Sequence, residues 1–273
     1  MSNLKTEISK VVLITGASSG IGKACAEYLG KRGYRVYGAS RRPPEQFAPD
    51  SFQMIQMDVA DDEAVRRGID LIVAREGRLD VAVNNAGNLI GGPIEDATIK
   101  EARFQFETNF FGVLRVCKAV LPIMRKQGAG HIINISSMAG RAAAPYQGLY
   151  SASKFAVEGL TEALRYEVRH VGIQVALIEP GDLHTANTDT RIKILRTQAY
   201  APYHDNAFQV YEHDERNGQS PAVVAPLVER IIQDSNPRLR YAIGSAFQML
   251  GLTLKNFVPH RLFEWGVAQI YKC

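Results

Sequence analysis

The sequence of 273 residues contains few cysteines, and their spacing excludes several classes of protein. Its three cysteines, Cys25, Cys117 and Cys273, form no CxxC pair and no cluster with metal-ligand spacing. An odd number of widely separated thiols argues against a disulfide framework and against a zinc site. We therefore expect no metal centre and a reducing compartment, the cytoplasm.

Long apolar runs and concentrated charge are also absent. No stretch of about 18 apolar residues is present to cross a membrane, and the opening MSNLKTEISK has no apolar core of a signal peptide. The 32 Lys and Arg and 28 Asp and Glu residues give a net charge of +4, and the basic residues are scattered. These features argue against a transmembrane protein and against nucleic-acid binding.

Short β-branched runs alternate with longer segments of helical periodicity. Several of the runs are apolar almost throughout, as expected of strands that are buried on both faces. Helical periodicity is clear at residues 24–33 and 158–172, and Gly172 is a helix stop signal. The predicted strands are residues 11–15, 35–40, 52–58, 79–85, 131–136 and 173–179, with 240–244 as a candidate seventh.

This alternation predicts an α/β fold, a single-domain Rossmann-type doubly wound parallel sheet of about seven strands with helices on both faces. No repeat, low-complexity tract or linker divides the chain, so we predict one domain over residues 1–273. Within it, about 182–220 is predicted to be a substrate loop and about 245–273 an apolar C-terminal extension.

A glycine-rich turn, TGASSGIG at residues 15–22, follows the first predicted strand and opens a helix. Gly16 would form the tight turn, Gly20 would let the backbone approach a pyrophosphate, and Gly22 would let the helix pack on the strand. The free N–H groups and the positive dipole end of the helix would then face the phosphates. The predicted dinucleotide-binding turn comprises Gly16, Ser18, Ser19, Gly20, Ile21 and Gly22.

The end of the second predicted strand indicates which dinucleotide binds. NAD-binding proteins place an acidic residue there, which accepts a hydrogen bond from the ribose 2′-hydroxyl. This chain has Ser40, Arg41 and Arg42 instead, and a guanidinium there would pair with a 2′-phosphate. The sequence therefore favours NADP(H) as cofactor.

Seven short motifs then follow one another in a specific order. They are TGASSGIG (15–22), MDV (57–59), NNAG (84–87), TNFFG (108–112), NISSMAG (134–140), YSASK (150–154) and EPGDLHT (179–185). With these motifs the sequence resembles the classical short-chain dehydrogenases/reductases over about residues 10–185.

The resemblance implies four catalytic residues. Tyr150 is the general acid/base, and Lys154 binds the nicotinamide ribose and lowers the pKa of the phenol. Ser137, thirteen residues before Tyr150, hydrogen-bonds the substrate oxygen and is preferred to Ser136 on that spacing alone. Asn109 holds a water that links the lysine to solvent.

The chemistry is consistent with this assignment independently of the resemblance. Residues at i and i+4 share one face of a helix, so the phenol of Tyr150 and the ammonium of Lys154 can point into the same space. A free phenol has a pKa of about 10, and a nearby positive charge favours its ionised form.

The resemblance also implies further cofactor contacts. Asp58 and Val59 would touch the adenine, and the loop after the fourth strand would lie along the adenosine ribose and the phosphates. The loop after the sixth strand would border the nicotinamide. The residues of these two loops are Asn85, Ala86 and Gly87, and Pro180, Gly181, Leu183 and Thr185.

The substrate side of the sequence leaves alternatives open. Tyr200, Tyr203, Phe208 and Tyr211 would either contact the substrate or pack on the core. The apolar tail would be a lid over an apolar substrate, a subunit interface or an interfacial membrane contact. A short element at 259–263 is similar to the 17β-hydroxysteroid-dehydrogenase-like branch of the family. The large apolar residues of the tail include Phe247, Leu250, Leu254, Phe257, Phe263 and Trp265.

These observations together predict an NADP-dependent oxidoreductase that interconverts a ketone and a secondary alcohol on a steroid-, retinoid- or acyl-like substrate. A 3-oxoacyl-thioester reductase is the alternative enzyme, and a non-catalytic NADP-binding regulator is the alternative outside enzymes. The resemblance further implies a homodimer or homotetramer, with contacts through the helices that contain residues 110–125 and 151–170.

Overall fold

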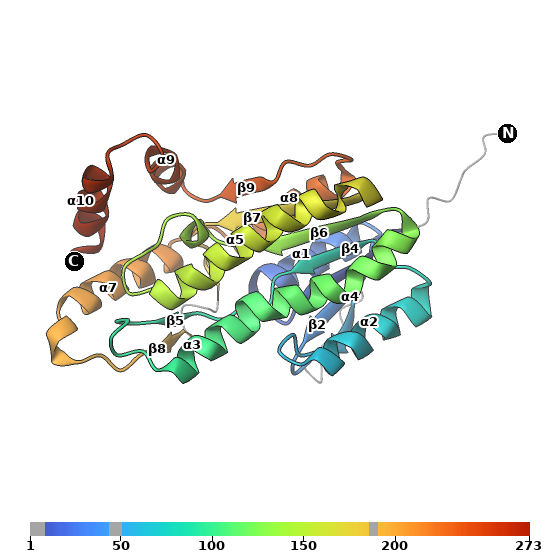
Figure 1. The fold of residues 1–273 in the computed structure, drawn as a ribbon, viewed down its shortest axis with the longest axis horizontal. Coiled ribbons are helices and arrows are strands. Elements are labelled where there is room, and N and C mark those ends of the chain that lie inside the picture. The colour runs from blue at the N-terminus through green and yellow to red at the C-terminus, as the bar shows by residue number, and fades with distance from the viewer. Residues whose placement is uncertain (1–8, 44–50, 186–190) are drawn as a thin grey trace.

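The computed structural model describes residues 9–43, 51–185 and 191–273, and its centre is a sheet of seven parallel strands (Figure 1). The strand order is β3-β2-β1-β4-β6-β7-β9. The order reverses between β1 and β4, which is the topological switch point of a doubly wound sheet. The predicted fold class is therefore confirmed. The strands are β1 (Val11–Thr15), β2 (Arg35–Ser40), β3 (Gln53–Gln56), β4 (Val81–Asn84), β6 (Gly130–Ile135), β7 (Ile173–Pro180) and β9 (Arg240–Ile243).

Helices cover both faces of this sheet (Figure 1). Because successive side chains of a strand point to opposite faces, each strand supplies two cores. In β1, Val11 and Leu13 pack with α2, α4 and α5, whereas Val12 and Ile14 pack with α1 and α8. The helices are α1 (Gly20–Lys31), α2 (Asp62–Glu76), α4 (Gly112–Gln127), α5 (Gly148–Val168) and α8 (Val224–Gln233).

The predicted strand bounds are correct for β1 and β2, where the apolar pattern of the sequence is sharp, and wrong for β3, a strand at the edge of the sheet. β1 and β2 have the predicted bounds. The strand predicted at 52–58 is shortened to β3, because this edge strand pairs only with Tyr37–Ser40 of β2. Gly172, with φ of 77°, ends the segment after α5 in the left-handed conformation, as predicted.

Shorter elements connect and extend this framework. The predicted loop of about 182–220 is not one loop, since its described part contains β8 and α7. Beside the large sheet, β5 (Ile90–Gly91) and β8 (Ile192–Lys193) form a second, two-stranded sheet. The remaining elements are α3 (Ile99–Phe106), the π-helix η1 (Glu107–Phe111), the 3₁₀ turns η2 (Met138–Gly140), η3 (Arg169–Val171), η4 (Gln198–Tyr200) and η5 (Pro221–Val223), and α7 (Tyr203–Arg216).

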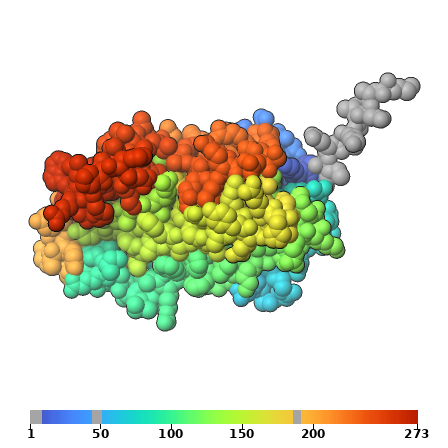
Figure 2. Space-filling model, turned by 45° about the horizontal axis from the view of Figure 1, so that its top comes forward, coloured from blue at the N-terminus to red at the C-terminus, as the bar shows by residue number. Residues whose placement is uncertain are grey.

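The apolar tail folds into two helices, α9 (Ala246–Leu254) and α10 (His260–Tyr271). Figure 2 shows this segment, in red, covering one end of the molecule next to α7, and α10 contacts α7. Among the residues that the structure describes, no helix has both the length and the apolar character that a membrane crossing requires.

Candidate active site

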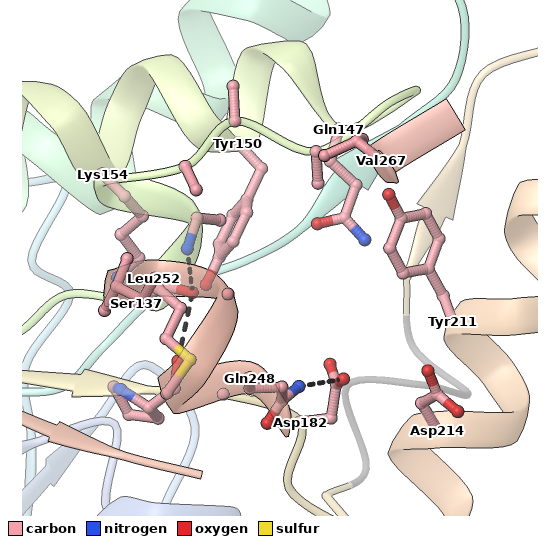
Figure 3. Close-up of a pocket in the computed structure, with 18 of the residues that line it drawn as sticks. Ser137, Gln147, Tyr150, Lys154, Asp182, Tyr211, Asp214, Gln248, Leu252 and Val267 are labelled. Atoms are coloured by element: carbon pink, nitrogen blue, oxygen red, sulfur yellow. Dashed lines mark hydrogen bonds between the residues drawn. The ribbon is translucent and has the colours of Figure 1, made fainter. Parts of the chain in front are cut away.

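A cavity of about 550 Å³ opens at the carboxyl ends of the central strands (Figure 3). Its floor is formed by the segments that follow β4, β6 and β7, and α5 supplies one wall. The opposite side is built from α7, α9 and α10. This is the position at which open α/β sheets bind their ligands.

Tyr150 and Lys154 both face this cavity from the first turns of α5 (Figure 3). The Lys154 side chain runs down to the sheet, where Nζ donates a hydrogen bond to the Ile135 carbonyl at 2.8 Å. Nζ lies 5.8 Å from the centre of the Tyr150 ring. The i and i+4 spacing therefore brings the two groups together, as the sequence predicts.

Ser137 contacts Tyr150, whereas Ser136 has a different environment. The Ser137 hydroxyl hydrogen-bonds the Tyr150 phenol. It also accepts from the Ala139 N–H at 3.1 Å and lies 3.4 Å from the Pro180 carbonyl. The Ser136 hydroxyl is buried and has no hydrogen-bond partner among the described residues. Both serines line the cavity, and the choice of Ser137 as the residue that hydrogen-bonds the substrate oxygen stays a prediction.

Asn109 lies in the π-helix η1, outside the cavity lining and fully buried. Its amide nitrogen donates to the Asn88 carbonyl at 3.0 Å and to Ser153 Oγ at 3.1 Å, and its oxygen accepts from the Asn88 N–H at 2.9 Å. Ser153 in turn donates to the Tyr150 carbonyl at 2.7 Å. A π-helix is rare and often marks a functional site. Neither Asn88 nor Ser153 is among the predicted residues, since only the folded chain brings them to Asn109.

Burial dominates the titration of Tyr150 and Lys154. It raises the pKa of the Tyr150 phenol, and the hydrogen bond with Ser137 opposes this shift. Burial also lowers the pKa of Lys154 to about 8, opposed by the carboxylate of Glu158. The direction for Tyr150 is opposite to the lowering that the resemblance implies, because loss of solvation outweighs the other influences on the phenol. At neutral pH the phenol is protonated and the lysine is mostly charged.

The three predicted glycines have separate structural roles. Gly16 has φ of 68°, and a Cβ there would lie 2.8 Å from Ala86 Cα. A Cβ at Gly22 would lie 2.4 Å from the Gly16 carbonyl oxygen, so only glycine lets α1 approach the strand. Gly20 has φ of 55°, and among the described residues a Cβ there would meet only Thr185, at 3.8 Å.

The turn fits the phosphates of a dinucleotide. Ser19 is the N-cap residue of α1, but its side chain makes no capping hydrogen bond. The first N–H groups of the helix are therefore available to a phosphate at the open face above Gly20. Ser18 is partly buried and Ser19 exposed in this turn, and Ile21 lines the cavity.

A pair of hydrogen-bonding side chains fixes the turn to β4. Asn85 Nδ2 donates to the carbonyls of Thr15 at 2.9 Å and Gly16 at 3.2 Å. Thr15 Oγ1 accepts from the N–H groups of Asn85 at 2.9 Å and Ala86 at 3.0 Å. Thr15 was not predicted as a site residue, although its place at the start of the TGASSGIG motif is a signal that could have indicated it.

The predicted adenosine side lies at the ends of β2 and β3. Ser40 Oγ accepts from the Arg42 N–H at 3.2 Å, and the exposed guanidinium groups of Arg41 and Arg42 form no ion pair among the described residues. Asp58 Oδ1 accepts from the Ala60 N–H at 3.0 Å, and Val59 is buried against Gly112. The exposed guanidinium groups of Arg41 and Arg42 therefore lie beside the glycine-rich turn that precedes α1.

The predicted residues divide into those that line the cavity and those that lie behind or beside it. The predicted residues outside the lining are Gly16, Ser18, Ser19, Gly20, Gly22, Ser40, Arg41, Arg42, Asp58, Val59, Ala86 and Asn109. The members of the lining are Ile21, Asn85, Gly87, Ser137, Tyr150, Lys154, Pro180, Gly181, Leu183 and Thr185.

The four aromatic residues of the 182–220 segment do not share one role. Tyr211 lines the cavity. Phe208 is buried and stacks on His204 with ring centres 4.2 Å apart. Tyr200 hydrogen-bonds Glu95, and Tyr203 is exposed. One of the four thus faces the cavity.

The apolar tail supplies much of the cavity wall. The residues of α9, α10 and their connection that line it are Phe247, Gln248, Leu250, Gly251, Leu252, Leu254, Val258, Leu262, Phe263, Trp265, Gly266, Val267, Ile270 and Tyr271. The polar groups of these side chains are the Gln248 amide, the Tyr271 hydroxyl and the Trp265 ring nitrogen. All the other side chains are apolar. This end of the cavity is suited to an apolar ligand.

Comparisons with known proteins agree with the fold and the motifs. The family model for short chain dehydrogenases matches residues 10–194. A 3-ketodihydrosphingosine reductase of Bacteroides thetaiotaomicron is 43% identical over 265 residues, which cover 96% of this chain and 98% of that protein.

Solved structures extend the similarity to the whole fold. A short-chain dehydrogenase from Streptomyces avermitilis has a TM-score of 0.83 and 34% identity, and the match covers 96% of this chain and 98% of that one. A short chain dehydrogenase/reductase from Burkholderia phymatum, in complex with NAD, has a TM-score of 0.78 and 27% identity. That match covers 91% of this chain and 93% of the neighbour.

Proposed function

The chain belongs to the short-chain dehydrogenase/reductase family of oxidoreductases, and from this premise we propose that it uses NADPH to reduce the ketone of a long-chain apolar substrate to a secondary alcohol. One observation carries the proposal. The Tyr150 phenol, hydrogen-bonded to Ser137 and close to Lys154, faces a cavity whose far wall is the apolar surface of α9 and α10. The 3-ketodihydrosphingosine reductase named above acts on a substrate of this kind, which supports the same substrate class here.

The chain's own residues supply the proton chemistry. When bound, NADPH supplies the hydride for the carbonyl carbon. Tyr150 donates its phenolic proton to the carbonyl oxygen, and Ser137 hydrogen-bonds that oxygen and orients it. The raised pKa of Tyr150 keeps the phenol protonated at neutral pH, which is the form that reduction requires. Lys154 binds the ribose of the cofactor, and Asn109 holds from η1 the water that links Lys154 to solvent.

The cofactor site supports NADP rather than NAD. The open turn above Gly20 and the free N–H groups of α1 suit the pyrophosphate. Arg41 and Arg42 stand where an acidic residue would select the 2′-hydroxyl of NAD, and both guanidinium groups are available to a 2′-phosphate. Asp58 and Val59 border the adenine in this arrangement.

We also propose a homo-oligomer formed through the outer faces of α4 and α5. Large apolar side chains are exposed on and next to these helices, which favours contact with a second copy. They are Phe111, Phe155 and Tyr166.

The test is NADPH oxidation with 3-ketodihydrosphingosine, a long-chain 3-oxoacyl thioester and a steroid ketone, in the wild type and in Tyr150→Phe. We expect the first substrate to be preferred and the variant to lose about 10²- to 10⁴-fold in kcat, because it lacks the proton donor. NADPH binding, followed by nucleotide fluorescence, should be retained. Tyr203→Phe is the matched control, since Tyr203 is exposed and outside the cavity.

Equal rates in the wild type and in Tyr150→Phe would contradict the assignment of Tyr150 as acid. A preference for the thioester would replace the proposed substrate with the alternative of a 3-oxoacyl-thioester reductase. Tight NADPH binding without turnover of any ketone would support the regulator instead.

A further inference from the structure

The side of the cavity across from Tyr150 is acidic, which the proposed reduction of a ketone does not require. Asp182 follows β7, and Asp214 and Glu215 lie on α7; all three line the cavity. Figure 3 shows Asp182 and Asp214 on one side of the space, and Tyr150 and Gln147 on the other. Gln248 of α9 donates a hydrogen bond to Oδ2 of Asp182, and Oδ1 has no hydrogen-bond partner among the described residues.

Gln147 is an independent indication that a polar ligand binds here. Its side chain is 6% exposed and lines the cavity, and the amide points into the space between Tyr150 and Tyr211 (Figure 3). Within the described ranges, the amide makes no hydrogen bond. The amide atoms are accessible from the cavity and are not sealed in the protein interior, so they can donate to and accept from a polar group of a ligand that enters it.

The charges at this end of the cavity do not balance. Three carboxylates line it, and among the described residues Arg191 pairs with one of them, Glu215. The Arg191 guanidinium does not line the cavity and lies over the rings of Phe208 and Tyr211. Burial, followed by the carboxylates of Glu215 and Asp214, raises the pKa of Asp182 to about 6. A carboxyl group in this situation gains from a cation that enters with the ligand.

We propose that Asp182, together with Asp214 and Gln147, forms a subsite for an ammonium group next to the substrate ketone, so that the substrate is a long-chain α-amino ketone. The inference rests on the proposed ketone reduction and deepens it. Asp182 and Tyr150 line the same cavity from opposite sides, so a head group bound between them faces both side chains (Figure 3). The alkyl chain then lies along α9 and α10, and the amide of Gln147 accepts from the ammonium group or binds a neighbouring hydroxyl.

The test compares two ketones in the wild type and in Asp182→Asn. One is 3-ketodihydrosphingosine, which carries the amine, and the other is the same long-chain ketone without the amine. Asparagine keeps the acceptor for Gln248 and removes only the charge. We expect kcat/KM for the amino ketone to fall about 10- to 100-fold, since the lost contact joins two charged groups, and kcat/KM for the other ketone to stay unchanged.

Two further variants separate local charge from general damage. Asp214→Asn, at an exposed position, should lower kcat/KM for the amino ketone about two- to fivefold. Glu212→Gln is the matched control, because Glu212 lies on the same helix, pairs with Lys193 at 2.6 Å and does not line the cavity. We expect Glu212→Gln to leave kcat/KM unchanged for both ketones.

The pH dependence provides a readout that a merely structural role would not produce. Between about pH 5 and about pH 7, Asp182 loses its proton and gains the charge that binds the ammonium group. For the wild type, kcat/KM should therefore rise over this range with the amino ketone and not with the other ketone, and Asp182→Asn should lose the rise. Among the described residues, the groups that act on Asp182 or on which it acts are Asp214, Glu215, Arg191, Gln248, Tyr271 and Tyr150.

The outcomes separate the subsite from the reaction. If the wild type reduces both ketones equally well and Asp182→Asn lowers both by the same factor, the subsite is refuted and the ketone reduction stands. If no ketone is reduced, calorimetric binding of the saturated long-chain 2-amino-1,3-diol with NADP⁺ decides. Weaker binding in Asp182→Asn, with no change for the N-acetylated diol, supports the subsite, and equal binding refutes it.

Discussion

At the scale of single residues, Arg41 and Arg42 offer the most direct test of cofactor selection. Both are exposed just after β2, at the carboxyl edge of the sheet, and neither forms an ion pair within the described residues. Removing them should therefore cost little stability. Their loss should matter only to a ligand that carries an extra phosphate at this edge.

We predict that Arg41→Ala with Arg42→Ala raises the Kd of NADPH about 10- to 100-fold and leaves the Kd of NADH unchanged. The reason is the loss of charge-assisted hydrogen bonding to the 2′-phosphate, which contributes about 1.5–3 kcal/mol in total. Titration of nucleotide fluorescence measures both constants. Arg169→Ala is the control, since this exposed arginine precedes β7 at the opposite edge. An equal loss of affinity for NADPH and NADH would show that the arginines do not read the 2′-phosphate.

Local sequence predicts some site residues and fails for others for a physical reason. Tyr150 and Lys154 are four residues apart on one helix, so helical geometry alone brings them together. Thr15 and Asn85 are 70 residues apart, and Asn88 reaches Asn109 across 21. Such contacts exist only after β1 and β4 have paired and η1 has formed, so local spacing does not reveal them.

At the scale of elements, the turn between β1 and α1 combines strain with open space. Gly20 has φ of 55°, which disfavours any other residue, yet of the residues that the structure describes a Cβ there would meet only Thr185, at 3.8 Å. A Cβ added at Gly22 would instead clash with the Gly16 carbonyl oxygen. The two glycines therefore differ in what a substitution would damage.

We predict that Gly20→Ala destabilises the protein by only about 1–2 kcal/mol but weakens NADPH binding at least about tenfold, because the new methyl group occupies the approach of the pyrophosphate. Thermal unfolding measures the first quantity and calorimetry the second. Gly77→Ala, at the end of α2, is matched in strain, since Gly77 has φ of 68° and a Cβ there would have no atom of the described residues within 4 Å. It should lose similar stability and no affinity. Equal affinity losses in the two variants would mean that strain alone explains the effect.

The sheet could be predicted from sequence because its strands carry their own signal. β1 and β4 are buried at every residue, which gives the continuous apolar runs from which they were predicted. Bounds at the ends depend on partners, as β3 shows by ending where its pairing with β2 ends. The π-helix at Asn109 has no periodic signature that distinguishes it from the α-helices before and after it.

At the scale of the whole molecule, the C-terminal helices complete the cavity from a distance in sequence of about a hundred residues. The sequence left a lid, an interface and a membrane contact open, because an amphipathic helix does not specify what its apolar face will meet. In the fold, residues of α9 and α10 line the same cavity as Tyr150. Phe263 is one of them, whereas Phe257 in the connection is 81% exposed and outside the lining.

If α9 and α10 hold the alkyl chain of the substrate, kcat/KM should increase with chain length. Each buried methylene contributes about 0.8 kcal/mol, or roughly a fourfold increase, until the chain outgrows the cavity. We predict that Phe263→Ala reduces this increase and lowers kcat/KM for the longest ketone about tenfold or more, while a short ketone is unaffected. Phe257→Ala should leave the whole chain-length series unchanged, since its side chain lies outside the cavity. If Phe263→Ala lowers the rates of short and long ketones by the same factor, α10 does not bind the chain and serves the packing of the catalytic wall instead.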